Sequence, residues 1–125
     1  MFSKYSFKYK INGDFLHVVY SGTIFKKEME EIMDKVYKLI KEYNIKKVLI
    51  DALQSDVKLE LFESLAFAKE YPPEFKQVKT AVVEKQEKRE QYRVHETFID
   101  NRALNMKFFN AITEAEKWLG LTLTI

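Results

Sequence analysis

The sequence contains no cysteine and only three glycines in its 125 residues. The lack of cysteine excludes disulfide scaffolding, thiol catalysis and cysteine-ligated metals. Gly13, Gly22 and Gly120 lie too far apart to form a glycine-rich phosphate-binding loop. The chain also lacks an apolar run long enough for a membrane span or a signal peptide. These absences predict a soluble, cytoplasmic protein without a membrane span.

Neither sign of charge is in large excess. Lysine and arginine number 21, aspartate and glutamate number 19, and the formal net charge is +2. This balance argues against a dedicated nucleic-acid-binding protein, which would carry a lopsided basic face, and against a polybasic membrane anchor. Apolar residues make up 46% of the chain, which is ample material for a core at this length. We expect one domain spanning residues 1–125.

The N-terminal part of the chain has the pattern of a β-hairpin. Residues 5–11 alternate apolar and polar side chains with a period of two, which is typical of a half-buried strand. Asn12 and Gly13 tolerate the positive φ angles of a tight turn, and residues 15–20 form a second strand-like run. The two runs predict an antiparallel hairpin.

After the hairpin, helical spacing and short apolar runs alternate along the chain. The expected helices cover residues 28–43, 57–71, 85–104 and 113–119, and the expected strands cover 46–51, 78–83 and 106–109. Asn44 is expected to end the first helix, and Thr113 and Glu116 have the spacing of a capping box at the start of the last. The order ββαβαβαβα predicts an α/β fold: a mixed, largely parallel sheet with the hairpin at its edge and helices packed on it.

Four stretches together carry a resemblance to the SpoIIAA-like STAS family. They are "VVYSGTIFKKEME", "KKVLIDALQSD", "VKTAVVE" and "MKFFNAITEAEKWL", and they span most of the chain. The resemblance implies a single STAS-like domain, non-enzymatic and regulatory, that binds a protein partner in the manner of anti-sigma-factor antagonists. In those antagonists a serine after the central strand is phosphorylated. The Asp-Ser-Ser/Thr-Gly motif of that switch is missing here, and residues 55–58, Ser-Asp-Val-Lys, stand in its place.

Asp51, Ser55 and Asp56 are the candidate residues of a regulatory or ligand-binding loop. Asp51 follows the apolar run 48–50, and a carboxylate at the carboxyl end of such a strand can hold a loop amide or a cation. It can equally close the strand by accepting loop N–H groups. Ser55 and Asp56 are both good helix N-cap residues, and a helix N-terminus also favours added phosphate. We expect one of the two to cap a helix beginning near Val57.

Aromatic residues on the later expected helices exceed what a minimal core of this size needs. Phe62, Phe67, Tyr92 and Phe98 fall on the expected second and third helices. Helical spacing usually places such residues in the core, but their number leaves room for an apolar pocket or a dimer face. Similarity of SpoIIAA-like proteins to lipid-binding Sec14 domains implies an alternative function, a carrier or sensor of a small apolar ligand held between helices and sheet.

The sequence contains no catalytic signature. His17 and His95 have no metal-ligand spacing, and His95 lacks the second histidine of a zinc-protease helix. The charged run 84–93 mixes both signs, as a solvated helix face does. We therefore expect no enzyme activity, no cofactor and no metal, a protein partner, and a possible homodimer.

Overall fold

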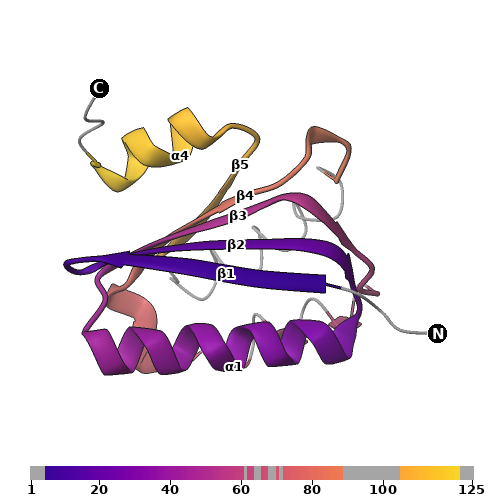
Figure 1. The fold of residues 1–125 in the computed structure, drawn as a ribbon, viewed down its shortest axis with the longest axis horizontal. Coiled ribbons are helices and arrows are strands. Elements are labelled where there is room, and N and C mark those ends of the chain that lie inside the picture. Colours follow the sequence, from indigo (N-terminus) through magenta and orange to yellow (C-terminus); the bar gives the residue numbers. More distant parts are fainter. Residues whose placement is uncertain are drawn as a thin grey trace.

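The computed structural model describes residues 5–60, 62–63, 66–67, 70, 72–88 and 105–121, apart from the side chain of Phe75. Within this part of the chain the elements are β1 (Tyr5–Asn12), β2 (Phe15–Ile24), α1 (Lys26–Tyr43), β3 (Lys47–Val57), the 3-10 turn η1 (Pro73–Gln77), β4 (Lys79–Val83), the 3-10 turn η2 (Gln86–Lys88), β5 (Met106–Phe109) and α4 (Ile112–Leu119). The sheet lies between α1 on one face and α4 on the other (Figure 1).

The sheet has the strand order β1-β2-β3-β4-β5. β1 and β2 are antiparallel, and the remaining neighbours, β2 with β3, β3 with β4 and β4 with β5, are parallel. The parallel connections need crossovers, which place helices on the sheet faces. The prediction of an α/β fold with a mixed sheet and the hairpin at its edge is confirmed.

The helix that follows the hairpin begins and ends where its sequence allows. Glu28 accepts a hydrogen bond from the Phe25 backbone N–H at 2.9 Å, which satisfies one free donor of the first turn. At the other end Asn44 takes a left-handed conformation with φ 53°, and its backbone N–H bonds to the Ile40 carbonyl. Asn is one of the few residues that tolerate this conformation, so the predicted stop at Asn44 is confirmed.

Two hydrophobic clusters fill the two sides of the sheet. Strand residues with alternate spacing, including Leu16, Val18, Val48 and Ile50, pack with α1 in the larger cluster. The intervening residues Leu49, Ala81 and Val83 face α4 and pack with its Ala115 and Leu119. The sheet is therefore covered on both faces over β3 and β4, which explains the continuous apolar runs 48–50 and 81–83 in these strands.

Two predicted elements differ from the structure. β3 does not end at Asp51 but continues to Val57, so the helix predicted over 57–71 cannot begin there; the described residues 62–63 and 66–67 of this segment are helical. The last helix starts at Ile112 with Ala111 as its N-cap and without a side-chain cap, so the capping box predicted at Thr113 is wrong. Residues 89–104, most of the predicted third helix, lie outside the described part.

Candidate functional site at the end of the central strand

The central strand β3 continues past Asp51 because β2 continues beside it. A β-bulge separates the paired segment that ends at Asp51 from the one that begins at Gln54. Val19 is paired with Asp51, but Ser21 is paired with Gln54, so β3 carries one more residue than β2 in this interval. Pairing then resumes as far as Ile24 and Val57. Residues 21–24 and 54–57 thus extend beyond Val83, where β4 ends, and we call this two-stranded extension the β2–β3 arm.

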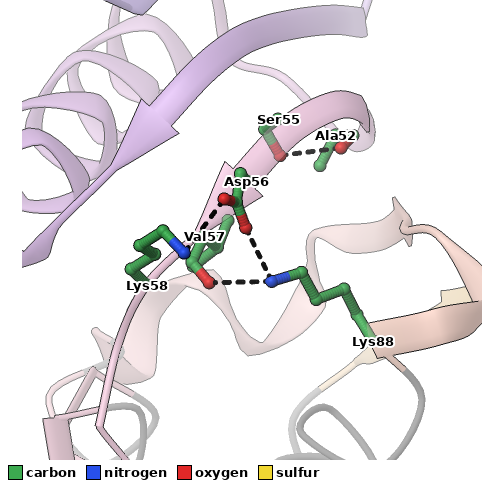
Figure 2. A network of polar contacts seen from close by, with 6 residues as sticks. All are labelled: Ala52, Ser55, Asp56, Val57, Lys58 and Lys88. Carbon is green, nitrogen blue, oxygen red and sulfur yellow. Dashed lines mark hydrogen bonds and ion pairs between the residues drawn. The ribbon is translucent and has the colours of Figure 1, made fainter. Parts of the chain in front are cut away.

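Asp51 and Ser55 satisfy the backbone groups of this bulge. The Leu53 backbone N–H donates to Asp51 Oδ1 at 3.1 Å. Figure 2 shows the second contact, in which Ser55 Oγ donates to the Ala52 carbonyl at 2.7 Å. A bulge interrupts the regular ladder and leaves backbone groups without strand partners. Because buried backbone groups must be hydrogen-bonded, the two side chains stabilise the irregularity that lets β3 continue.

The prediction that Ser55 or Asp56 caps a helix is wrong. Both residues belong to β3, and Ser55 is fully buried, with an exposed fraction of 0%. Downstream, the Glu60 backbone N–H donates to Glu63 Oε1 at 2.9 Å, which is the reciprocal contact of a capping box. The local sequence offers a hydroxyl and a carboxylate suited to a cap, but strand pairing with β2 determines the conformation.

Asp56 lies at the centre of an ion-pair network on the β2–β3 arm. Its carboxylate accepts from Lys88 Nζ at 2.8 Å and from Lys58 Nζ at 3.1 Å, and Lys88 also donates to the Val57 carbonyl at 3.4 Å (Figure 2). The hydrogen bond from Lys88, followed by that from Lys58, lowers the pKa of Asp56. Because Lys88 belongs to η2, the network joins the segment after β4 to the end of β3.

Glu84 is a buried acid that the sequence prediction missed. It follows β4 directly, and its exposed fraction is only 7%. Its backbone is held by β5, since its N–H donates to the Phe109 carbonyl at 2.9 Å and its carbonyl accepts from Asn110 Nδ2 at 3.2 Å. Within the described part of the chain, Glu84 Oε1 is buried without a hydrogen-bond partner. Burial raises the pKa of Glu84 to about 7, against a smaller opposing effect of a hydrogen bond from the Lys85 backbone.

Tyr20 places a third ionisable group in this region. It is buried in the larger hydrophobic cluster, which packs against α1, with an exposed fraction of 4%. Burial raises its pKa well above the usual value, and the charges of Glu84 and Asp51 add to this effect. Tyr20, Asp51 and Glu84 come from neighbouring strands near the carboxyl end of β4, where open α/β sheets commonly bind ligands.

The candidate aromatic residues do not form one surface among the described residues. Phe67 packs against the larger cluster, whereas Phe62 is 67% exposed. Tyr92 and Phe98 lie outside the described residues, as does His95. His17 is half-buried on β2, its ring stacks on Phe15 at 6.2 Å between centroids, and its Nε2 has no partner in the described structure.

The described residues provide no catalytic constellation. The buried Ser55 hydroxyl is bonded to a backbone carbonyl, not to a base. Across the described ranges, no group of three or more His, Cys, Asp or Glu side chains could hold a metal ion. None of the helices seen in the structure is both long and apolar enough to cross a membrane. The polar side chains of β3 thus stabilise the strand and join it to η2.

Comparison with known proteins shows the fold. The structure is similar to an anti-sigma factor antagonist from Mycobacterium paratuberculosis, with a TM-score of 0.65, 12% sequence identity, and coverage of 94% of this chain and 96% of that one. It is also similar to an uncharacterized DUF3478-family protein from Shewanella loihica PV-4 with a SpoIIAA-like fold, at a TM-score of 0.59, 21% identity, and coverage of 92% and 93%. No family model and no curated protein matches the sequence. The chain therefore has the SpoIIAA-like fold of STAS domains, as predicted.

Proposed function

We propose that this protein is a non-enzymatic regulatory module that works by binding another protein. The observation that carries the proposal is the likeness, over 94% of the chain, to an anti-sigma factor antagonist. The described side chains agree with a binding role, because the polar groups near the end of β3 are engaged in structural contacts. We also propose that it works in the cytoplasm, which its lack of cysteine favours.

The proposed module works without phosphorylation of Ser55. A kinase needs an accessible hydroxyl, whereas Ser55 has an exposed fraction of 0% and donates to the Ala52 carbonyl. A phosphate adds close to two negative charges, and burying them unpaired inside the sheet would be very costly. Asp56 does not supply the negative charge of a phosphoserine in its place, since its carboxylate is paired with Lys58 and Lys88. Without that phosphorylation switch, the extent of partner binding is set by the amount of this protein or by a change at another site.

The alternative function, carriage of a small apolar ligand, has less support. It depends on four aromatic residues, of which the structure describes two. One of these, Phe67, contributes to the core, and the other, Phe62, faces solvent. We therefore retain the protein-binding function as the proposal.

The proposal is tested by cross-linking and affinity purification of the tagged protein from its native cells, followed by reconstitution with the purified candidate partner. We expect one protein to be enriched reproducibly and to form a complex of fixed stoichiometry in sizing experiments. Native mass spectrometry of the freshly purified protein separates the alternative, because a copurifying lipid mass would support the carrier function instead. Phosphate on Ser55 in the same material would contradict the proposed absence of a switch there.

A further inference from the structure

We propose that the outer edge of β1 binds an extended, acidic segment of a partner protein, which adds to the sheet as a further strand. The proposal builds on the protein-binding function above and assigns it a surface and a partner chemistry. It rests on three features of β1: a backbone edge with no strand partner among the described residues, the lysines on both faces beside this edge, and an exposed aromatic ring.

The backbone of β1 offers the first feature. β1 is the outermost strand of the described sheet, and β2 is its neighbour on one side only. In an antiparallel ladder, alternate residues direct their N–H and C=O groups away from the paired strand. Over the eight residues of β1 this leaves a row of backbone donors and acceptors that another strand can use. The opposite edge strand, β5, has only four residues.

Lysines lie on both faces of the sheet beside this edge, together with one acid, Glu31, whose carboxylate accepts from the Tyr5 hydroxyl at 2.7 Å. Lys8 and Lys10 are exposed and lie on the same face of β1, the face on the α4 side of the sheet. Their cross-strand partners on β2 are Val19 and His17. On the other face Lys35 of α1 lies over the rings of Tyr5 and Phe7, at 5.8 and 5.2 Å from their centroids.

None of these three lysines has a carboxylate within 4.0 Å among the described residues. Acidic side chains on an added strand would supply opposite charges beside Lys8 and Lys10, on the face of the sheet away from Lys35. A second copy of β1 would instead bring further lysines to the same edge, and like charges on paired strands are destabilising. The charges therefore favour a different, acidic chain over self-pairing.

The aromatic side chains of Phe7 and Tyr9 on β1 indicate which type of residue the other face of the added strand should carry. Tyr9 is 48% exposed although it lies beside Phe7, with 6.1 Å between the ring centroids. Because side chains of a strand alternate between faces, a partner strand with acidic residues next to Lys8 and Lys10 has its intervening residues next to Phe7 and Tyr9. Apolar residues there would cover the exposed ring. The expected ligand thus alternates acidic and apolar residues.

The test uses three capped synthetic peptides and the whole protein. The first alternates glutamate and valine, the second alternates lysine and valine, and the third has the composition of the first but groups its glutamates in one block. We expect the first to bind best by calorimetry and to slow amide hydrogen exchange in β1 but not in β5, as measured by NMR. Equal binding of the block peptide, or binding without protection of β1, would overturn the proposal, because either result indicates general attraction of a polyanion.

Charge reversal on the protein locates the site. In K8E/K10E we expect the glutamate peptide to bind about tenfold more weakly and the lysine peptide to bind better than to the original protein. The matched control K107E/K117E changes the net charge equally at exposed positions on β5 and α4, and should leave binding nearly unchanged. An equal loss of peptide affinity in both variants would overturn the assignment to β1. Protection of β1 from hydrogen exchange that rises with protein concentration in the absence of peptide would also overturn the proposal, because it indicates that β1 pairs with a second copy.

The partner found by affinity purification separates this inference from the proposed function. Weaker binding of that partner to K8E/K10E than to K107E/K117E would support docking at β1. Equally tight binding to K8E/K10E and to the original protein would overturn docking at β1 while leaving the protein-binding function intact.

Discussion

At the scale of single residues, the two polar side chains of the bulge show how a suspected site can have a structural role. Asp51 accepts from the Leu53 N–H, and Ser55 donates to the Ala52 carbonyl, within the few residues where β3 carries an extra residue. Each side chain thus provides a hydrogen bond to a backbone group inside the bulge. Their loss should therefore affect the stability of the β2–β3 arm before it affects any binding event.

Ser55→Ala should lower the free energy of unfolding by about 1–2 kcal/mol, because it removes the buried partner of the Ala52 carbonyl. Ser55→Asp should lower it much more, since it places an unpaired charge at a fully buried position. Urea denaturation followed by circular dichroism measures both. Ser6→Ala is the control, because Ser6 Oγ lies 2.6 Å from Ser21 Oγ at an exposed position. A Ser55→Asp variant as stable as the original protein would contradict burial of this side chain.

Glu84 makes stability depend on pH. Its pKa is raised from an ordinary 4.5 to about 7, so between these values the folded protein holds a proton that the unfolded chain has released. The stabilising contribution of the protonated form is complete below about pH 4.5, declines as pH rises, and is lost above about pH 7. The shift corresponds to roughly 3 kcal/mol across this window.

The Glu84→Gln variant tests this dependence, because glutamine keeps the shape of a protonated carboxyl but cannot ionise. We expect it to match the original protein near pH 4.5 and to be more stable at pH 8 by up to roughly 3 kcal/mol. Thermal melts over this pH range measure the difference. Glu74→Gln, at a position where 61% of the side chain is accessible, is the exposed control for loss of one carboxylate. Identical profiles for Glu84→Gln and the original protein would show that folding does not change the pKa of Glu84.

At the scale of elements, the spacing of apolar residues predicted the structure correctly where either the strand pattern or the helix pattern was clear. The alternation in β1, the tight turn with Gly13 at φ 63°, the helical spacing of α1 and its stop at Asn44 each follow from local preferences. The end of β3 could not be predicted in this way. Residues 52–57 contain good cap residues, and only pairing with residues 21–24 of β2 makes them a strand. Burial of Glu84 escaped prediction for a similar reason, since its backbone contacts, Phe109 and Asn110, are distant in sequence.

The buried part of β3 supplies the sharpest test of the sheet arrangement. Ile50 is 5% exposed and is paired with Val18 of β2 and Val82 of β4. Ile50→Asp would bury an unpaired charge between two strands, at a cost of several kcal/mol, which is comparable with the whole stability of a small domain. We expect no cooperative melting transition. Gln54→Asp, at an exposed position of the same strand, should melt cooperatively. Cooperative melting of both variants would contradict the placement of β3 at the centre of the sheet.

At the scale of the whole molecule, the two surfaces most suited to association lie on different elements. The edge of β1 carries exposed lysines and has no strand partner in the described sheet, whereas Phe62 presents a large apolar side chain in the segment after β3. The exposed fraction of Phe62, 67%, is the highest among the exposed large hydrophobic residues that the structure describes. A charged strand edge suits a different, acidic chain, and an exposed phenyl ring suits an apolar contact. The two can therefore operate independently.

We predict a weak homodimer formed through the segment that carries Phe62. Burying one exposed aromatic side chain in each subunit contributes roughly 2–3 kcal/mol per ring, which suits association at high protein concentration only. Sedimentation equilibrium over rising concentration should give a mass that increases toward twice 14.9 kDa. Phe62→Ser should hold the mass at that of the monomer, whereas K8E/K10E should still associate, because the β1 edge is not part of this contact. A constant monomer mass for the original protein would rule out the dimer, and loss of association only in K8E/K10E would assign it to β1 instead.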